Sequence, residues 1–167
     1  MSDKNNAKRL ARLSVLLCLA LLMSYVEHIT AFDVGVPGVK VGFANIVVLF
    51  VLYRMKWSYA LAVNLCRVFV STLLFGNAVS LLYGLCGALF SFCVMYLLKR
   101  WDVFGVLGVS VAGAVCHNIA QLGAAAVLLK SLYVFSYAPV LLIAGTVFGA
   151  VTGIICAILL KKTQFFS

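Results

Sequence analysis

The sequence contains little charge, and very little of that charge is acidic. Only 10% of the 167 residues are charged, and four acidic residues stand against thirteen lysines and arginines. A soluble domain carries about 25% charged residues, so this chain has too few polar side chains to cover a surface in water. A hydrophobic content of 65% also excludes a disordered chain. The composition predicts an integral membrane protein with little mass outside the bilayer.

The motifs of several enzyme classes are missing as well. The sequence has no G-x-x-x-x-G-K-[ST] loop for nucleotide phosphates and no H-E-x-x-H zinc motif. Magnesium–diphosphate chemistry needs clustered carboxylates, but Asp33 and Asp102 are the only aspartates beyond the N-terminus. The six cysteines form no C-x-x-C pair. We therefore expect no catalytic activity in this chain, and neither a metal site nor a cofactor.

Six apolar runs predict an all-α fold, a single transmembrane domain of about six helices over residues 1–167. A spanning helix needs about 20 apolar residues, and the second run is shorter than that. It follows the stretch 34–40, which contains glycine and proline. This stretch is either partly embedded, which requires surrounding protein or a cavity, or an outer loop before a tilted helix. The runs cover residues 10–31, 41–53, 58–75, 79–98, 103–129 and 138–160.

The basic residues alternate between the two sides of this bundle. All but three of the thirteen lie in the N-terminus, the second and fourth connections and the C-terminus. Lys40 and Lys130 fall on the other side, and Arg67 lies within a span. Basic residues mark the cytoplasmic side of membrane proteins, so both termini are predicted to be cytoplasmic. The positive charge is thus a topology signal and does not indicate nucleic acid.

Polar side chains inside the spans gather in the predicted outer half of the bundle. An arginine at the centre of a span costs about 2.5–3.5 kcal/mol, so Arg67 needs a partner inside the protein. A structural network, with Glu27 pairing Arg67, is one explanation. There are more polar groups than helix packing needs, so we predict a ligand pocket open to the outside. The candidate binding residues are Glu27, Lys40, Asn45, Arg67, Asn77, His117, Asn118 and Gln121.

The chemistry of these side chains favours a small anionic ligand. Lys40 and Arg67 would neutralise its charge, and the amide side chains would fix its orientation. Glu27 would either position Arg67 or face the ligand itself. His117 and Gln121, four residues apart, share one helical face.

Small residues indicate where helices pack closely. Gly145, Gly149 and Gly153 recur at four-residue spacing in the last run, a pattern that lets helix backbones approach one another. We predict that this stripe packs within the bundle. A weaker stripe on the first run consists of Ala7, Ala11, Ala20 and Ser24.

Three stretches resemble the Gx transporter family, whose members are also labelled heptaprenyl diphosphate synthase component I. They are P-G-V-K-V-G-F-A-N at 37–45, Arg67 with L-F-G-N at 74–77, and the stretch 109–121 ending in H-N-I-A-Q. The resemblance implies a multi-pass protein of the bacterial inner membrane, similar to the substrate-binding S components of energy-coupling factor transporters. Such proteins bind a small molecule and associate with a membrane coupling subunit and two ATPases. The stripe from Ala7 to Ser24 would then contact the coupling subunit.

The second label implies a different function. The chain would be a non-catalytic membrane partner of a prenyl synthase subunit, taking part in heptaprenyl diphosphate synthesis for menaquinone. A third interpretation is a purely structural subunit of a membrane redox complex. Copurifying partners and a bound small molecule distinguish these hypotheses.

Overall fold

The computed structural model describes residues 2–29 and 42–164, and within this part every regular element is a helix. The predicted all-α class is confirmed, and the helices agree with the six apolar runs to within a few residues except at the termini. There the basic N-terminal segment is helical too, and the last helix continues beyond residue 160. A short 3-10 helix, η1, was not predicted. The elements are α1 (Ser2–Ile29), α2 (Phe43–Arg54), α3 (Trp57–Phe75), α4 (Ala78–Trp101), α5 (Val106–Leu129), η1 (Leu132–Tyr137) and α6 (Ala138–Gln164).

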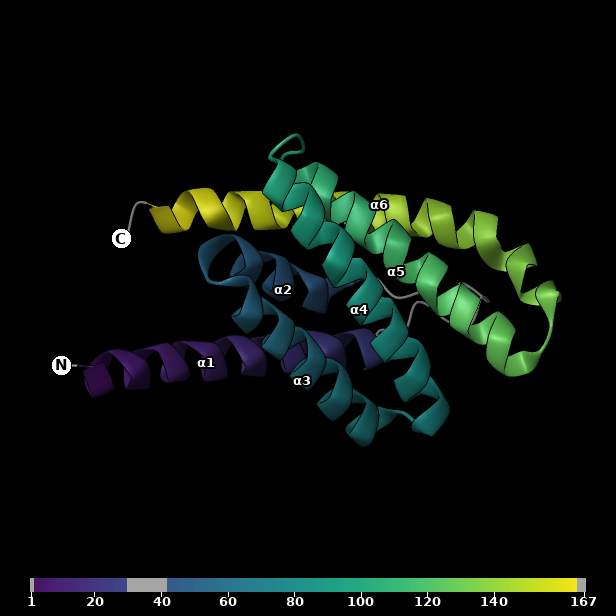
Figure 1. Cartoon of the computed structure of the whole chain (residues 1–167), viewed down its shortest axis with the longest axis horizontal. Helices are drawn as coiled ribbons and strands as arrows, with labels where there is room; N and C mark the ends of the chain where they lie inside the picture. Colours follow the sequence, from purple (N-terminus) through teal and green to yellow (C-terminus); the bar gives the residue numbers. More distant parts are fainter. Residues whose placement is uncertain (1, 30–41, 165–167) are drawn as a thin grey trace.

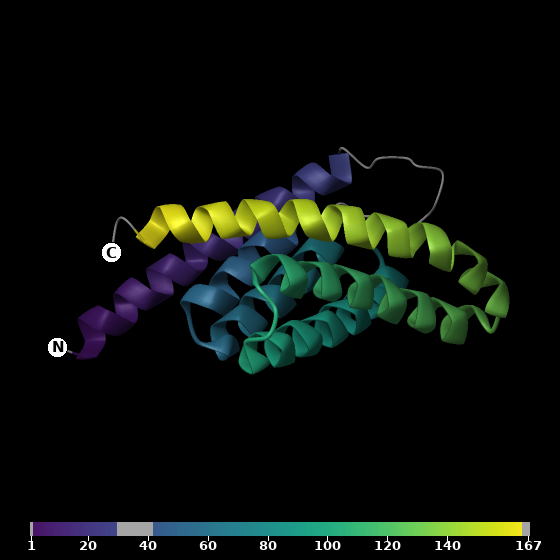
Figure 2. The same cartoon turned by 90° about the horizontal axis from the view of Figure 1, so that it is seen from above.

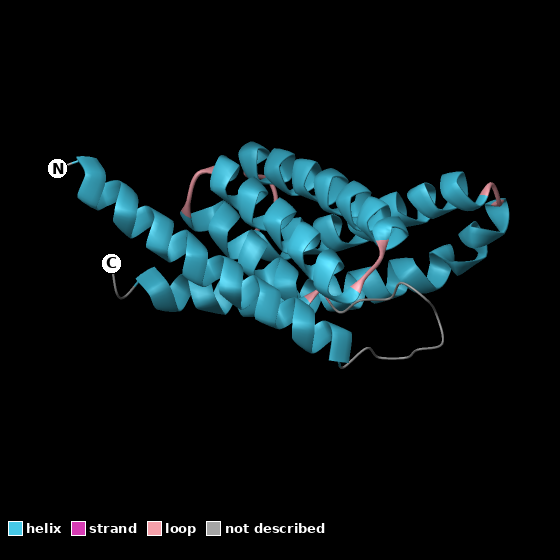
Figure 3. Cartoon of the chain, turned by 90° about the horizontal axis from the view of Figure 1, so that it is seen from below, coloured by secondary structure: helices cyan, strands magenta, loops and turns pink. Residues whose placement is uncertain are grey.

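The helices run back and forth between two ends of an elongated bundle (Figure 1). The start of α1, the α2–α3 connection, the α4–α5 connection and the end of α6 all lie toward the same end of the bundle, which we call the basic end. The α3–α4 turn and the joint between α5 and η1 lie at the opposite end, where α5 and α6 project furthest (Figures 2 and 3). The alternation of basic charge in the sequence therefore matches the path of the chain.

Among the described residues, five helices are long and apolar enough to cross a membrane, so the chain is a multi-pass membrane protein. The exception is α2, with 12 residues, because its rise of about 18 Å falls short of a hydrocarbon core of about 30 Å. The second helix is short, as predicted. The preceding stretch, with Lys40, lies outside the described residues.

The short helix α2 forms the centre of the core. Val48, Val51 and Leu52 have no exposed surface, and buried residues occur on every face of the helix. A helix that is apolar all round is expected inside a bundle. The core around α2 includes Ala20 from α1, Ala60 from α3, Phe92 from α4, Val109 from α5 and Cys156 from α6.

The glycine stripe of α6 packs against α5, as the sequence predicts. A Cβ atom on Gly149 would lie 2.9 Å from the Cα of Val111, and one on Gly153 would lie 3.0 Å from the Cα of Leu107. Such distances leave no space for a side chain. The two helices are also joined by a hydrogen bond of 2.9 Å between the hydroxyls of Ser110 and Thr152.

We expect Gly149→Ala to destabilise the fold by about 1–3 kcal/mol, because the added methyl group would overlap the backbone of α5. The matched control is Gly123→Ala on α5, where an added Cβ would meet nothing within 4 Å. This control should be neutral or slightly stabilising, since alanine is the better helix former. Unfolding free energies in mixed detergent would measure both changes. Equal effects of the two variants would show that α5 and α6 do not pack through the stripe.

Candidate functional site

Arg67 lies on α3 and is only partly satisfied by the protein. Its Nη2 donates a hydrogen bond of 2.9 Å to Oδ1 of Asn64, and Nδ2 of Asn64 donates one of 3.1 Å to the carbonyl of Ala88 on α4. The Nε atom of Arg67 is buried and has no hydrogen-bond partner among the described residues. A guanidinium offers five donors. Arg67 therefore retains donor capacity for an acceptor that carries negative charge.

His117 and Gln121 lie on α5 and contact α4 at Gly87, next to the residue whose carbonyl Asn64 contacts. A Cβ atom on Gly87 would lie 2.8 Å from Cε1 of His117 and 2.9 Å from Cγ of Gln121, so glycine is what allows both side chains to approach. Gly87 is the neighbour of Ala88, whose carbonyl accepts from Asn64. Polar side chains of α3 and α5 thus meet α4 at one level, near its midpoint and towards the end opposite the basic one.

Glu27 lies near the end of α1, where its carboxylate accepts a hydrogen bond of 2.5 Å from the backbone N–H of Phe43. Phe43 is the first residue of α2, so Glu27 satisfies one of the free amides of that helix and complements its dipole. Gly42, the residue before Phe43, has φ +79°, a conformation that favours glycine. Glu27 also lies near enough to Arg67 to act on it electrostatically.

Lys99, on α4, occupies the corresponding position at the other end of α2. Its Nζ donates a hydrogen bond of 2.5 Å to the carbonyl of Leu52 and lies 5.1 Å from the centroid of the Tyr53 ring. In the sequence, Lys99 counts only among the basic residues that mark the cytoplasmic side. Lys99 follows the end of the fourth run, on the same predicted side of the membrane as the end of the short second run. This position was the sequence signal for the contact, and it was missed.

The remaining candidates do not join Arg67. Nδ2 of Asn118 donates 2.8 Å to the carbonyl of Leu141 on α6, so Asn118 faces away from His117. Asn77 is the exposed N-cap of α4, in a capping box with Ser80. Asn45 is half-buried in the first turn of α2. The position of Lys40 lies outside the described part of the chain.

The small residues of α1 divide into two pairs. Ala7 and Ala11 are exposed, and they remain available to a partner. Ala20 has no exposed surface because it packs in the core of the chain itself. Ser24 is half-buried, and its hydroxyl is covered. The four residues therefore do not form one continuous contact surface.

Within the described residues, no group of three or more His, Cys, Asp or Glu side chains is placed to hold a metal ion. The side chains that meet α4 at Gly87 and Ala88 are an imidazole and two amides, and Asn64 connects them to the guanidinium of Arg67. Such groups suit an anion better than a cation. A cavity of about 320 Å³ lies at the basic end instead. None of the candidate binding residues lines it.

Comparison with known proteins gives one result. The family described as heptaprenyl diphosphate synthase component I matches residues 16–159. The chain belongs to this family. The name heptaprenyl diphosphate synthase component I denotes one part of a synthase and implies a further subunit that completes it. No curated protein and no solved structure matches the chain.

The pairing of Lys99 with the end of α2 leads to a prediction. Lys99→Met should reduce the free energy of unfolding by about 1–2 kcal/mol, because a free carbonyl and the negative end of the helix dipole lose their cation. Amide exchange in the last turn of α2 should become faster. The matched control is Lys162→Met, an exposed lysine at the same end. The interpretation is wrong if Lys162→Met lowers the stability as much as Lys99→Met does.

Proposed function

We propose that this protein binds a small anionic molecule inside its helix bundle, at Arg67, in the bacterial cytoplasmic membrane. The observation that carries the proposal is the buried Nε of Arg67, in the middle of a membrane helix, which has no hydrogen-bond partner among the described residues. Ionisable groups at such depth are rare and are typical of substrate pathways and ligand sites. A purely structural arginine would be expected to have all its buried donors paired.

The residues around Arg67 support an anion as the ligand. Asn64 orients one edge of the guanidinium, which leaves the Nε edge for an oxygen of the ligand. His117 and Gln121 approach the same level of α4 from α5 and would supply further donors. Glu27 is held by the N–H of Phe43, so it serves as a fixed counter-charge that keeps Arg67 tolerable when no ligand is bound.

Transport is the process that this binding would serve. The sequence contains no nucleotide-binding loop, so movement of the ligand against a gradient would depend on a separate ATPase. We propose that the chain acts as an S-component-like subunit and associates with a membrane coupling subunit. Ala7 and Ala11, exposed on α1, would be available for this contact.

The test is native mass spectrometry of the protein released gently from its own membrane. The wild-type chain should retain a small acidic molecule, and Arg67→Leu should lose it. Loss of one partner of a buried charge pair typically costs 2–5 kcal/mol, so affinity should fall by at least about 30-fold. Arg67→Lys should bind with intermediate affinity, since lysine keeps the charge but not the planar donor pair.

The matched control is Arg100→Leu, which removes an exposed arginine from α4 and should leave binding unchanged. Unfolding measurements accompany each variant. We expect Arg67→Leu to fold, because leucine suits a membrane helix better than an arginine with unpaired donors. Retention of the same molecule by Arg67→Leu at wild-type occupancy would contradict the proposal.

A second candidate function is supported by the family name. The chain would be an accessory membrane subunit that holds a prenyl synthase at the membrane, where a lipid-soluble product is released. In this case a tagged chain should copurify with a prenyl synthase, and deletion should lower the amount of long-chain quinone. Copurification with a coupling subunit and ATPases, without a synthase, would instead favour transport.

A further inference from the structure

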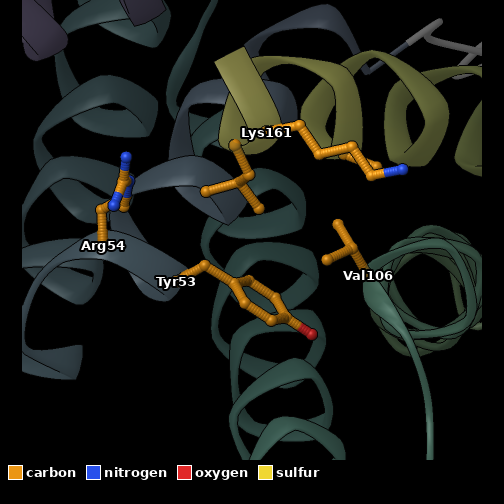
Figure 4. A pocket seen from close by; sticks show the side chains of 6 residues that line it. Tyr53, Arg54, Val106 and Lys161 are labelled. Atoms are coloured by element: carbon orange, nitrogen blue, oxygen red, sulfur yellow. The ribbon is translucent and has the colours of Figure 1, made fainter. Parts of the chain in front are cut away.

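The cavity at the basic end is formed where three helices meet. Its volume is about 320 Å³, and Tyr53, Arg54, Val106, Ala157, Leu160 and Lys161 line it. Tyr53 and Arg54 end α2, Val106 begins α5, and the other three belong to the last part of α6. In Figure 4, Lys161 extends above Val106 while Arg54 lies on the opposite side of the pocket. The lining is thus apolar at its base and cationic at two edges.

The electrostatics of this pocket favour an anion. Arg54 and Lys161 are exposed, and within the described part of the chain neither forms an ion pair with a carboxylate. Val106 is the first residue of the 24-residue helix α5, whose N-cap is Gly105. Because Gly105 offers no side chain to cap the helix, the first amides of α5 add positive potential beside the pocket. Asp102 interacts with Tyr53, but it is a single carboxylate among several cations.

The surroundings suit a ligand with an apolar part. Val103, three residues before Val106, is 74% exposed, and Leu107, directly after Val106, is 45% exposed. Apolar surface therefore continues from the pocket onto the face of the bundle. Basic pockets between membrane helices on the cytoplasmic side bind phosphate headgroups of lipids. Tyr53 adds a hydroxyl that donates to an oxygen of such a group.

We propose that this pocket binds a phosphate-bearing group. Arg54 and Lys161 contact the phosphate from two sides, and Val106, Ala157 and Leu160 contact the atoms next to it. The phosphate belongs either to the headgroup of an anionic lipid or to a soluble phosphate or diphosphate. The site is separate from Arg67, which lies near the level of Gly87 in the other half of the bundle. Failure of one site would therefore leave the other untouched.

The experiment uses the full chain in phosphatidylcholine nanodiscs and two probes, short-chain phosphatidylglycerol and inorganic pyrophosphate. Binding is followed by the rise in melting temperature and by native mass spectrometry. In the double variant R54Q/K161Q the apparent Kd of the bound probe should rise by about tenfold or more, since two cations near the membrane surface are removed. The control R100Q/K162Q removes two exposed cations of the same end and should change Kd by less than about twofold.

A further variant tests the cavity without changing its charge. Ala157→Trp fills the pocket and should abolish binding while the basic residues remain. Because Arg54 and Lys161 are exposed, R54Q/K161Q should melt at the wild-type temperature when no probe is present, and this shows that the fold is intact. Binding of phosphatidylglycerol alone assigns the site to a lipid, and binding of pyrophosphate assigns it to a soluble phosphate. The proposal is overturned if neither probe binds the wild type, or if both double variants lose affinity equally.

Discussion

Charged and free polar groups inside a membrane protein have to be paired by the protein itself. In this structure, two such pairings lie at the two ends of one short helix. The buried helix α2 is pinned at its start by Glu27 of α1 and at its end by Lys99 of α4. Each side chain meets backbone groups that would otherwise be free, and each has the sign that complements the helix dipole. A helix too short to span the bilayer thus receives at both ends the polar contacts that water would supply elsewhere.

Arg67 differs from these groups, because its buried Nε has no hydrogen-bond partner among the described residues. Glu27 is engaged with α2, so it acts on Arg67 as a nearby charge, while the guanidinium of Arg67 donates its hydrogen bond to Asn64. The adjacent residues Gly87 and Ala88 bring α3 and α5 to the same level of α4. The fold therefore stabilises one cation incompletely and places other donors at its level, which is the basis for proposing an anionic ligand.

Much of the architecture could be predicted from the sequence because membrane insertion imposes simple rules. Long apolar runs gave the helices, and alternating basic residues matched the path of the chain. Gly149 and Gly153 indicated a close packing of helices within the bundle, although not that α5 is the partner. The 3-10 helix η1 escaped notice because its residues, Leu132–Tyr137, lie in the connection between the fifth and sixth apolar runs. The helical N-terminus was missed because residues 2–9 are mostly polar and precede the first apolar run.

The site was harder to predict because the depth of a residue in the membrane does not tell in which direction its side chain points from the helix. His117 and Asn118 are neighbours at the same depth, yet one faces Gly87 of α4 and the other bonds to Leu141 of α6. Asn77 was grouped by depth with binding residues, but asparagine after a glycine at a turn is also a typical N-cap. Asn64, three residues before Arg67, was the nearest clue to the partner that the guanidinium actually has.

The central claim is that the protein itself does not fully satisfy Arg67. Proton-detected NMR of the arginine Nε–H groups, with the protein in nanodiscs and freed of small molecules, tests this directly. Arg67→Lys identifies the resonance by removing it. We predict an Arg67 Nε–H signal without the downfield shift of a strong hydrogen bond, and a large change in it when the retained ligand is returned. A strongly shifted signal in the ligand-free protein, unchanged by the ligand, would contradict the account.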